Sequence, residues 1–390
     1  MTAPPAHANV TLTILSIVFY SLIAFLCIGL PIAVLPGYVH DELGYGPMVA
    51  GLVIGLQYLA TLLIRPLAGR LADSMGTKKI ITWGLYGIAA SGLLTLIATL
   101  CQSWPALSLA PLLAARLLLG CGQGMVGVGT ASWGIAAVGA ENTAKVISWN
   151  GICSYGAVAF GAPIGVVLTG SLGFNTLGPA LVVLALVGLA VLRNKPSMPL
   201  VRGERMPFWS AFAKVAPYGL ALTLASIGYG TLTTFITLYY RENGWLGAAY
   251  CLTAFGISFV AARLVFINAI NHYGAMATAL ACMAVETLGF LLLWLAPSPA
   301  WALAGASLTG LGLSLVYPAL GVIAIRQVPS SSRGAGLGAF AVFFDLALAA
   351  AGPLMGVVAS YIGYGPIFLV AAGLSLAGLG LITSLGRKAQ

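Results

Sequence analysis

The sequence has very few charged residues. Of its 390 residues, 17 are Lys or Arg and eight are Asp or Glu, so 6% is charged, whereas soluble domains carry roughly 25%. Hydrophobic residues make up 60%. A soluble globule with so few charges would expose enough apolar area to drive association. The composition therefore excludes a soluble enzyme, a disordered chain and a nucleic-acid binder with a basic face, and it indicates an integral membrane protein.

The sequence also lacks the motifs of catalytic and metal chemistry. The six cysteines lie within or beside apolar runs and form no CxxC pair, so we expect small buried hydrophobic side chains. HExxH and Walker patterns are absent. Residues 122–127 match GxGxxG, but no strand precedes them, so these glycines are predicted to allow close helix contacts. We expect no enzyme activity, catalytic residues, metal or cofactor.

Long apolar runs account for most of the chain. A helix that crosses a hydrocarbon core of about 30 Å needs about 20 apolar residues. The runs predict an all-α membrane protein with twelve transmembrane helices. The predicted spans lie near residues 10–39, 47–69, 79–101, 106–129, 144–170, 177–192, 214–240, 247–270, 275–296, 300–325, 334–360 and 365–385.

The basic residues predict the orientation of these spans. Thirteen of the 17 lie in one alternating set of loops, and the opposite set contains only Arg241. By the positive-inside rule, the central loop and both termini are cytoplasmic. The net charge of +9 is therefore a consequence of topology, with some attraction to anionic membrane lipid, and requires no nucleic acid partner.

The chain divides into two halves that resemble each other. The polar segment Arg193–Trp209 separates six spans from six spans, and residues 64–76 align with 262–274, matching Arg65 to Arg263. Duplicated six-span halves are typical of transporters whose two bundles rock around a site at their interface. The predicted divisions are an N-terminal bundle (1–192), a cytoplasmic linker (193–213) and a C-terminal bundle (214–390).

The loop after the second span carries the sharpest motif. Residues 69–79 read GRLADSMGTKK and resemble the signature loop of the major facilitator superfamily, G-x-L-a-D-x-x-G-r-k. Thr77 stands where that pattern is commonly basic, so a charge relay in this loop would depend on Lys78. The second-half counterpart has Asn271 and no lysine, which predicts unequal inner gates. The residues expected to act in gating are Gly69, Asp73, Gly76, Lys78, Arg333, Pro163 and Pro353.

Three further segments resemble one branch of this superfamily. Pro31 and Pro36 resemble the proline pair of twelve-span drug/proton antiporters. Arg116–Gly120 resembles the span-four motif with a proton-relay arginine, although Leu119 replaces its usual Gln. Residues 161–165 resemble the antiporter motif of span five, with an alanine inserted between Gly and Pro. The resemblance implies a sugar-efflux or drug-efflux protein of the bacterial inner membrane.

Charges inside the spans are the expected sites of coupling, because each costs about 2.5–3.5 kcal/mol at a helix centre. The candidates are Asp345, Glu286 and Arg116. In the resembled fold, spans one, four, seven and ten line the cavity, and spans two, five, eight and eleven form the interface. Asp345 is accordingly expected to exchange a proton, and Arg116 to bind an anionic group or to influence the acid. Glu286, on an outer span, is either a structural contact or a second carrier, and Arg65 and Arg263 are expected to act in gating or structure.

Polar and aromatic side chains at helical spacing predict a wet cavity, although Ser and Thr also serve as contacts between helices. The expected substrate-binding residues are Tyr20, Arg116, Gln123, Asn150, Tyr229, Thr233, Tyr317 and Phe344. Such a cavity suits an amphipathic or zwitterionic small molecule.

The sequence thus predicts a monomeric, proton-coupled efflux transporter that works by alternating access. A proton-coupled importer of a sugar or organic acid would use the same residues, since direction depends on which states the proton stabilises. A channel or an intramembrane enzyme fits poorly, because neither a selectivity filter nor a catalytic set of residues is visible.

Overall fold

The chain folds as a bundle of long helices. The computed structural model describes residues 10–139, 142–196, 208–266, 268–328 and 333–388, and no strand occurs in these ranges. Eleven helices in them are long and apolar enough to cross a membrane, and α9 is a shorter apolar helix. The twelve predicted spans correspond to α1 (Val10–Ile32), α3 (Pro47–Met75), α4 (Thr77–Leu100), α5 (Pro105–Val138), α6 (Thr143–Leu172), α7 (Leu177–Arg193), α8 (Phe208–Glu242), α9 (Ala249–Val265), α11 (Ala275–Trp294), α12 (Pro299–Arg326), α13 (Arg333–Ile362) and α14 (Pro366–Lys388).

Short helical segments connect several of the long helices. They are α2 (Leu35–Gly37), the π-helix η1 (Tyr38–Glu42), the 3-10 turn η3 (Phe174–Thr176) and α10 (Ala269–Tyr273). The predicted first span, 10–39, is too long: α1 ends at Ile32, because Pro36 has no N–H for the carbonyl of Ile32. The predicted linker, 193–213, overlaps the start of α8, and residues 197–207 of that linker lie outside the described ranges.

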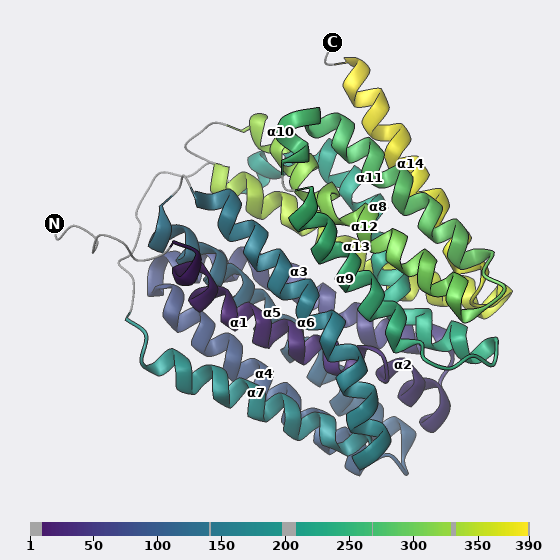
Figure 1. The fold of residues 1–390 in the computed structure, drawn as a ribbon. Helices are drawn as coiled ribbons and strands as arrows, with labels where there is room; N and C mark the ends of the chain where they lie inside the picture. Colours follow the sequence, from purple (N-terminus) through teal and green to yellow (C-terminus); the bar gives the residue numbers. More distant parts are fainter. Residues whose placement is uncertain (1–9, 140–141, 197–207, 267, 329–332, 389–390) are drawn as a thin grey trace.

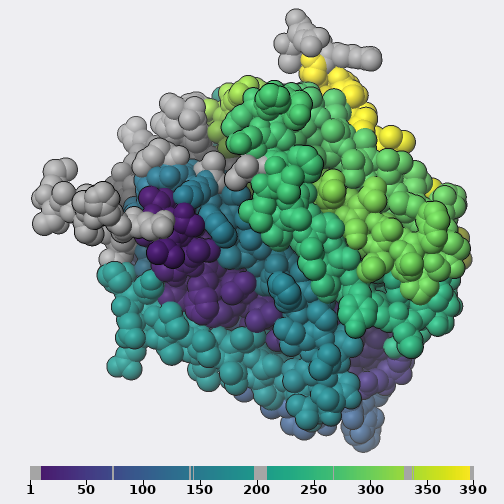
Figure 2. All heavy atoms as spheres, in the orientation of Figure 1, coloured from purple at the N-terminus to yellow at the C-terminus, as the bar shows by residue number. Residues whose placement is uncertain are grey.

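Helix packing repeats from one half to the other. In the first half α1 packs on α5, α6 and α7, and in the second half α8 packs in the same way on α12, α13 and α14. The pairs α3–α5, α4–α5 and α4–α7 recur as α9–α12, α11–α12 and α11–α14. The two halves lie side by side (Figure 1) and meet along one seam, with purple-to-teal atoms on one side and green-to-yellow on the other (Figure 2). The repeat seen in the sequence is therefore a structural repeat.

Glycines in equivalent positions let the backbones touch. A Cβ atom on Gly120 of α5 would lie 2.0 Å from the carbonyl oxygen of Gln57, and one on Gly310 of α12 would lie 2.2 Å from that of Phe255. Gly76 and Gly274, which the repeat also aligns, have φ of 91° and 85° and end their helices in a conformation that favours glycine. The glycines of the repeat thus serve the same purposes in both halves.

Two helix pairs join the halves. α3 packs on α13, and α6 packs on α9, so the second, fifth, eighth and eleventh spans form the interface, as the resemblance to the superfamily implied. The central α8 has 89% of its apolar window buried, against 33% for the segment that contains α7. The interface between the halves is therefore formed by helices of both bundles, and α8 is largely enclosed by its neighbours.

Gly120 offers a direct test of this packing. We expect Gly120→Ala to destabilise the protein by about 1–3 kcal/mol, because the new methyl group collides with the backbone of α3. The matched control is Gly127→Ala on the same helix, where a Cβ would meet no atom within 4 Å. The control should be neutral or slightly stabilising. Thermal unfolding of the two variants in detergent measures the difference, and equal midpoints would contradict the packing.

Candidate functional site

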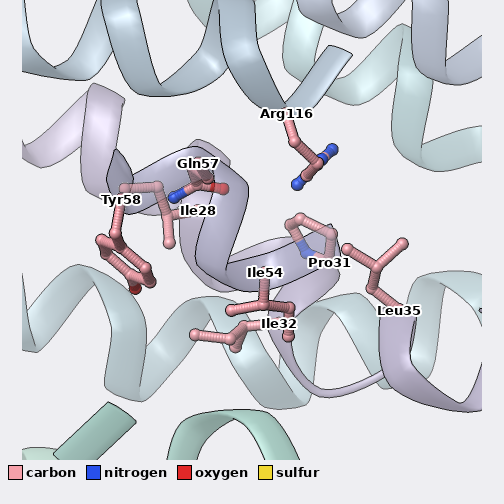
Figure 3. A pocket seen from close by; sticks show the side chains of 8 residues that line it. All are labelled: Ile28, Pro31, Ile32, Leu35, Ile54, Gln57, Tyr58 and Arg116. Carbon is pink, nitrogen blue, oxygen red and sulfur yellow. The ribbon is translucent and has the colours of Figure 1, made fainter. Parts of the chain in front are cut away.

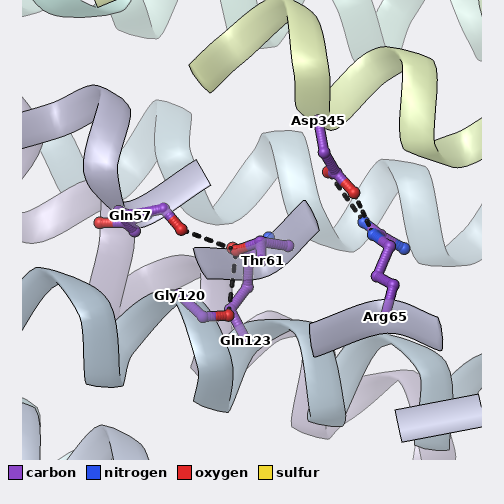
Figure 4. A network of polar contacts seen from close by, with 6 residues as sticks. All are labelled: Gln57, Thr61, Arg65, Gly120, Gln123 and Asp345. Carbon is purple, nitrogen blue, oxygen red and sulfur yellow. Dashed lines mark hydrogen bonds and ion pairs between the residues drawn. The ribbon is translucent and has the colours of Figure 1, made fainter. Parts of the chain in front are cut away.

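An ion pair bridges the two halves of the molecule. Arg65 of α3 donates from Nη2 to Oδ1 of Asp345 of α13 at 3.0 Å, and Arg65 Nε pairs with Asp345 Oδ2 (Figure 4). The Asp345 side chain is 2% exposed and the Arg65 side chain 24%. A guanidinium that meets both oxygens of a carboxylate makes a strong, oriented contact. The halves are therefore linked by a charge pair at a buried seam, a partnership that the sequence analysis did not assign.

Polar residues one and two turns away along α3 hold the first bundle together. Gln57, Thr61 and Arg65 follow each other at helical spacing and so lie along one face of α3. The Thr61 hydroxyl lies 2.9 Å from Gln123 Oε1 and 3.0 Å from the carbonyl oxygen of Gly120, both on α5 (Figure 4). The same face of α3 thus contacts α5 at one level and α13 at another.

Arg116 lies in a separate buried environment of the first bundle. It is 1% exposed, its Nη2 donates to Thr95 Oγ1 at 3.3 Å, and its Nε has no hydrogen-bond partner among the described residues. It faces a cavity of about 10 Å³, room for about one water molecule. The cavity is lined by Ile28, Pro31, Ile32, Leu35, Ile54, Gln57, Tyr58 and Arg116 (Figure 3). Arg116 therefore does not hold Asp345, which pairs with Arg65 instead.

Aromatic side chains from both halves converge at the interface. We call them the central aromatic cluster: Tyr155, Tyr229, Phe255, Phe259, Tyr317 and Phe344. The rings of Tyr155 and Phe259 stack with centroids 3.7 Å apart across the α6–α9 seam, and Tyr229 lies 6.4 Å from Phe344. Three predicted substrate-binding residues, Tyr229, Tyr317 and Phe344, are thus brought together, and sequence reasoning did not include the two α9 phenylalanines in this set.

Charged side chains border this cluster. The guanidinium carbon of Arg263 lies 4.8 Å from the ring centroid of Phe259, and Nη2 donates to the carbonyl oxygen of Ser314 at 2.6 Å. Tyr317 lies within electrostatic range of Arg65, Arg263 and Asp345. Aromatic rings, two arginines and one carboxylate therefore share one region at the centre of the molecule.

The other predicted substrate-binding residues lie elsewhere or are engaged. Tyr20 is buried inside the first bundle, where its ring stacks on Trp133 at 6.2 Å. The Thr233 hydroxyl bonds the carbonyl oxygen of Tyr229 on its own helix at 3.0 Å. Gln123 accepts from Thr61, as described above, and Asn150 has a buried Oδ1 with no partner in the described ranges. Of this group, Asn150 Oδ1 and the Tyr20 hydroxyl are buried without a hydrogen-bond partner among the described residues.

Glu286 lies away from the interface. It is fully buried on α11, Ser375 of α14 donates to its Oε2 at 3.3 Å, and its Oε1 has no partner among the described atoms. Gly312 of α12 packs against its backbone. This environment of α11, α12 and α14 matches a structural contact inside one bundle.

The predicted gate residues have several different environments. Lys78 donates to the carbonyl oxygen of Arg193 at 3.1 Å and to that of Lys195, so it caps the end of α7 within the first half. A Cβ on Gly69 would meet no atom within 4 Å, so no neighbouring helix packs closely against this position. The side chains of Asp73 and Arg333 lie outside the described residues.

The prolines of the predicted gate lie inside helices at the interface. Pro163 lies within α6, and Pro353 lies within α13. A Cβ on Gly55 of α3 would lie 2.8 Å from Pro353 Cδ, and one on Gly51 would lie 2.2 Å from the carbonyl oxygen of Gly352. The first two turns of α3 are therefore pressed against the last turns of α13.

A second ion pair closes the same end of the molecule. Arg241, at the end of α8, pairs with Asp41 of η1, and His40 Nδ1 lies 2.9 Å from Asp41 Oδ1. The η1 segment belongs to the first half and α8 to the second, so this contact also bridges the halves. We call Asp41 and Arg241 the outer latch, because the positive-inside rule predicts that the Arg241 end faces outward. Its Arg241 is the one basic residue that the sequence analysis assigned to the loops opposite the thirteen other basic loop residues.

Comparisons with known proteins agree with this architecture. The family model described as Major Facilitator Superfamily matches residues 17–266 and 219–388. An uncharacterized MFS-type transporter of Pseudomonas aeruginosa (strain LESB58) is 54% identical over 385 residues, 99% of this chain and 96% of that protein. One of Burkholderia mallei (strain SAVP1) is 49% identical over 386 residues, 99% of this chain and 95% of that protein.

Two solved structures share the fold at low sequence identity. The crystal structure of the human organic anion transporter MFSD10 (TETRAN) has a TM-score of 0.70 and 19% identity, and it covers 97% of this chain and 100% of that one. A variant of the nucleoside transporter NupG has a TM-score of 0.76 and 15% identity, with 95% of this chain and 99% of that one covered.

Removing the outer latch should make the cavity beside Ile54 more accessible from solution. The two side chains of the latch are partly exposed, so the pair contributes about 0.2–1 kcal/mol to the closed arrangement. We therefore expect Asp41→Asn to raise, by up to roughly fivefold, the rate at which a hydrophilic thiol reagent labels an Ile54→Cys reporter in a background without the native cysteines. Ile54 is 5% exposed and lines the cavity beneath α2. The control is Glu42→Gln, and equal rates in the two variants would contradict the latch.

Proposed function

The chain belongs to the Major Facilitator Superfamily, and from this premise we propose that it is a proton-coupled transporter that exports a small amphipathic molecule from bacteria. It is a multi-pass membrane transporter of that family. The proposal adds the coupling ion, the direction and the kind of substrate. Transport proceeds by alternating access, in which the two bundles rock around the central aromatic cluster.

The ion pair between Arg65 and Asp345 is the observation that carries the proposal. Among the buried acids with described side chains, Asp345 alone lies between the two halves. A proton on Asp345 removes the charge that holds Arg65, so the α3–α13 seam loosens, and release of the proton restores the pair. Because a buried arginine without its counterion is costly, the protonation state of Asp345 biases the balance between two arrangements of the bundles.

The contacts at the Arg241 end support an arrangement that is closed on that side. The outer latch and the backbone contact between Gly51 and Gly352 hold that end closed. Under the positive-inside rule, the Arg241 end faces the outside, and the basic loops face the cytoplasm. The inner face is then the side from which an exporter takes its substrate.

The direction of transport is supported by the antiporter-like motifs. The proline pair of Pro31 and Pro36 and the arginine motif of the fourth span resemble those of drug/proton antiporters. In an antiporter, substrate binding and the proton on Asp345 favour opposite arrangements of the seam, so that one leaves the site as the other arrives. An importer would have both favour the same arrangement, and the sign of proton movement distinguishes these mechanisms.

Removing the carboxylate tests the coupling. Asp345→Asn is expected to abolish substrate-driven proton movement, because the amide cannot take up or release a proton at this seam. The assay uses proteoliposomes loaded with a pH-sensitive dye and a compound that raises the unfolding temperature in a screen of sugars, amino acids, metallophores and antibiotics. Proton flux opposite to the substrate gradient supports antiport, flux in the same direction supports import, and unaltered flux in Asp345→Asn rejects the role of Asp345.

Two variants separate coupling from folding. Glu42→Gln, an exposed acid away from the seam, should transport like wild type. The double variant Arg65→Gln/Asp345→Asn removes both charges, so it should regain the stability that Asp345→Asn loses while remaining uncoupled. Restored proton movement in the double variant would contradict the proposal.

A further inference from the structure

Two arginines occupy equivalent places in the two halves, but only one of them has a counterion. The repeat aligns Arg65 of α3 with Arg263 of α9. Arg65 pairs with Asp345 across the α3–α13 seam. The register that aligns Pro163 with Pro353 puts Tyr155 of α6 in the place of Asp345. Across the second seam, the arginine therefore faces an uncharged aromatic residue.

The charge of Arg263 has only neutral partners. Arg263 is 6% exposed, Nη2 donates to the Ser314 carbonyl oxygen, and Nε is buried without a hydrogen-bond partner among the described residues. Nη1 packs directly against Gly151 of α6, where a Cβ would lie only 2.1 Å from it. The guanidinium is therefore enclosed by the α6–α9 seam with unused hydrogen-bonding capacity.

No described carboxylate can neutralise this cation. The acids with described side chains are Asp41, Glu42, Glu242, Glu286 and Asp345. The first three lie at the Arg241 end, Glu286 lies among α11, α12 and α14, and Asp345 already meets Arg65. A buried cation without a counterion is costly, so the binding of an anion beside Arg263 would be strongly favourable.

The surroundings of Arg263 indicate what such an anion looks like. The guanidinium lies over the ring of Phe259, which stacks on Tyr155, and Phe255 and Tyr229 continue the aromatic wall with centroids 4.9 Å apart. A planar carboxylate fits a guanidinium with two parallel hydrogen bonds, and an aromatic body can stack beside it. A cationic ligand is disfavoured, because two arginines face one carboxylate in this region.

We propose that Arg263 binds the carboxylate of the transported molecule, which is an amphipathic organic anion with an aromatic body held by the central aromatic cluster. The anion enters when α6 and α9 separate, and its carboxylate supplies to Arg263 the negative charge that Asp345 supplies to Arg65 in the other seam. The inference rests on the proposed function in one respect only, that the central aromatic cluster is the substrate site. It narrows the substrate from amphipathic or zwitterionic molecules to anions.

Thermal unfolding of the purified full chain in detergent tests the charge requirement. The probes are 2-naphthoate, its neutral amide 2-naphthamide and the cation 2-naphthylmethylammonium. We expect only the carboxylate to raise the unfolding temperature in a saturable way, because only a bound ligand stabilises the folded state. Equal stabilisation by the amide, or none by the carboxylate, would overturn the proposal.

Variants of Arg263 test whether this residue binds the carboxylate. Arg263→Gln should weaken the affinity for 2-naphthoate at least tenfold, while Arg326→Gln, which removes an exposed cation at the end of α12, should leave the affinity unchanged. Wild-type affinity in Arg263→Gln would reject the assignment. If that variant fails to fold, Arg263→Lys replaces it: a single ammonium cannot make two parallel bonds, so at least threefold weaker binding is expected and unchanged affinity rejects the role.

The binding measurement does not depend on a proton gradient. Saturable binding of 2-naphthoate through Arg263, together with proton movement that survives Asp345→Asn, leaves the anion site in place and rejects the coupling role. Proton-coupled flux of a neutral or cationic compound without binding of 2-naphthoate rejects the anion site and leaves the coupling role in place.

Discussion

Helices in a lipid bilayer gain little by burying apolar side chains against each other, because the lipid tails are just as apolar. Their contact depends instead on how closely the backbones can approach. The chain contains 50 glycines, and those at Gly120 and Gly310 press against the carbonyl groups of neighbouring helices in equivalent places. The contact between Gly51 and Gly352 does the same between the two halves. Close backbone packing thus builds each bundle and joins the two.

Against this apolar background, the few charged residues determine how the two seams differ. A cation and an anion in the seam between α3 and α13 neutralise each other. In the proposed mechanism, a single proton on Asp345 breaks this pair. The equivalent seam between α6 and α9 has a cation beside aromatic rings and no described acid. The halves share one fold but differ in the charge they place at the interface, and our proposals of proton exchange at one seam and anion binding at the other rest on this difference.

Sequence reasoning reached most of the fold but only part of the site. The twelve spans and the matched glycines Gly76 and Gly274 follow from hydropathy and from the repeat, which depend on local sequence. Tyr229, Tyr317 and Phe344 were predicted to bind substrate and do converge, whereas Tyr20 stacks inside the first bundle. The pairing of Arg65 with Asp345 was missed, although the lone acid of an interface helix was a signal for it.

The sequence by itself determined that the chain is a membrane protein, how many apolar spans it has and where the second half repeats the first. These properties follow from apolar run length, from the scarcity of charge and from internal similarity, all of which are read along one chain. The partner of each buried charge was decided only by the tertiary structure. Helix rotation and backbone approach set which side chains meet across a seam, and they depend on all the packed helices at once. For this reason, only the folded chain shows that Arg65 is neutralised by Asp345 and that Arg263 faces Tyr155 and Phe259 with no described acid beside it.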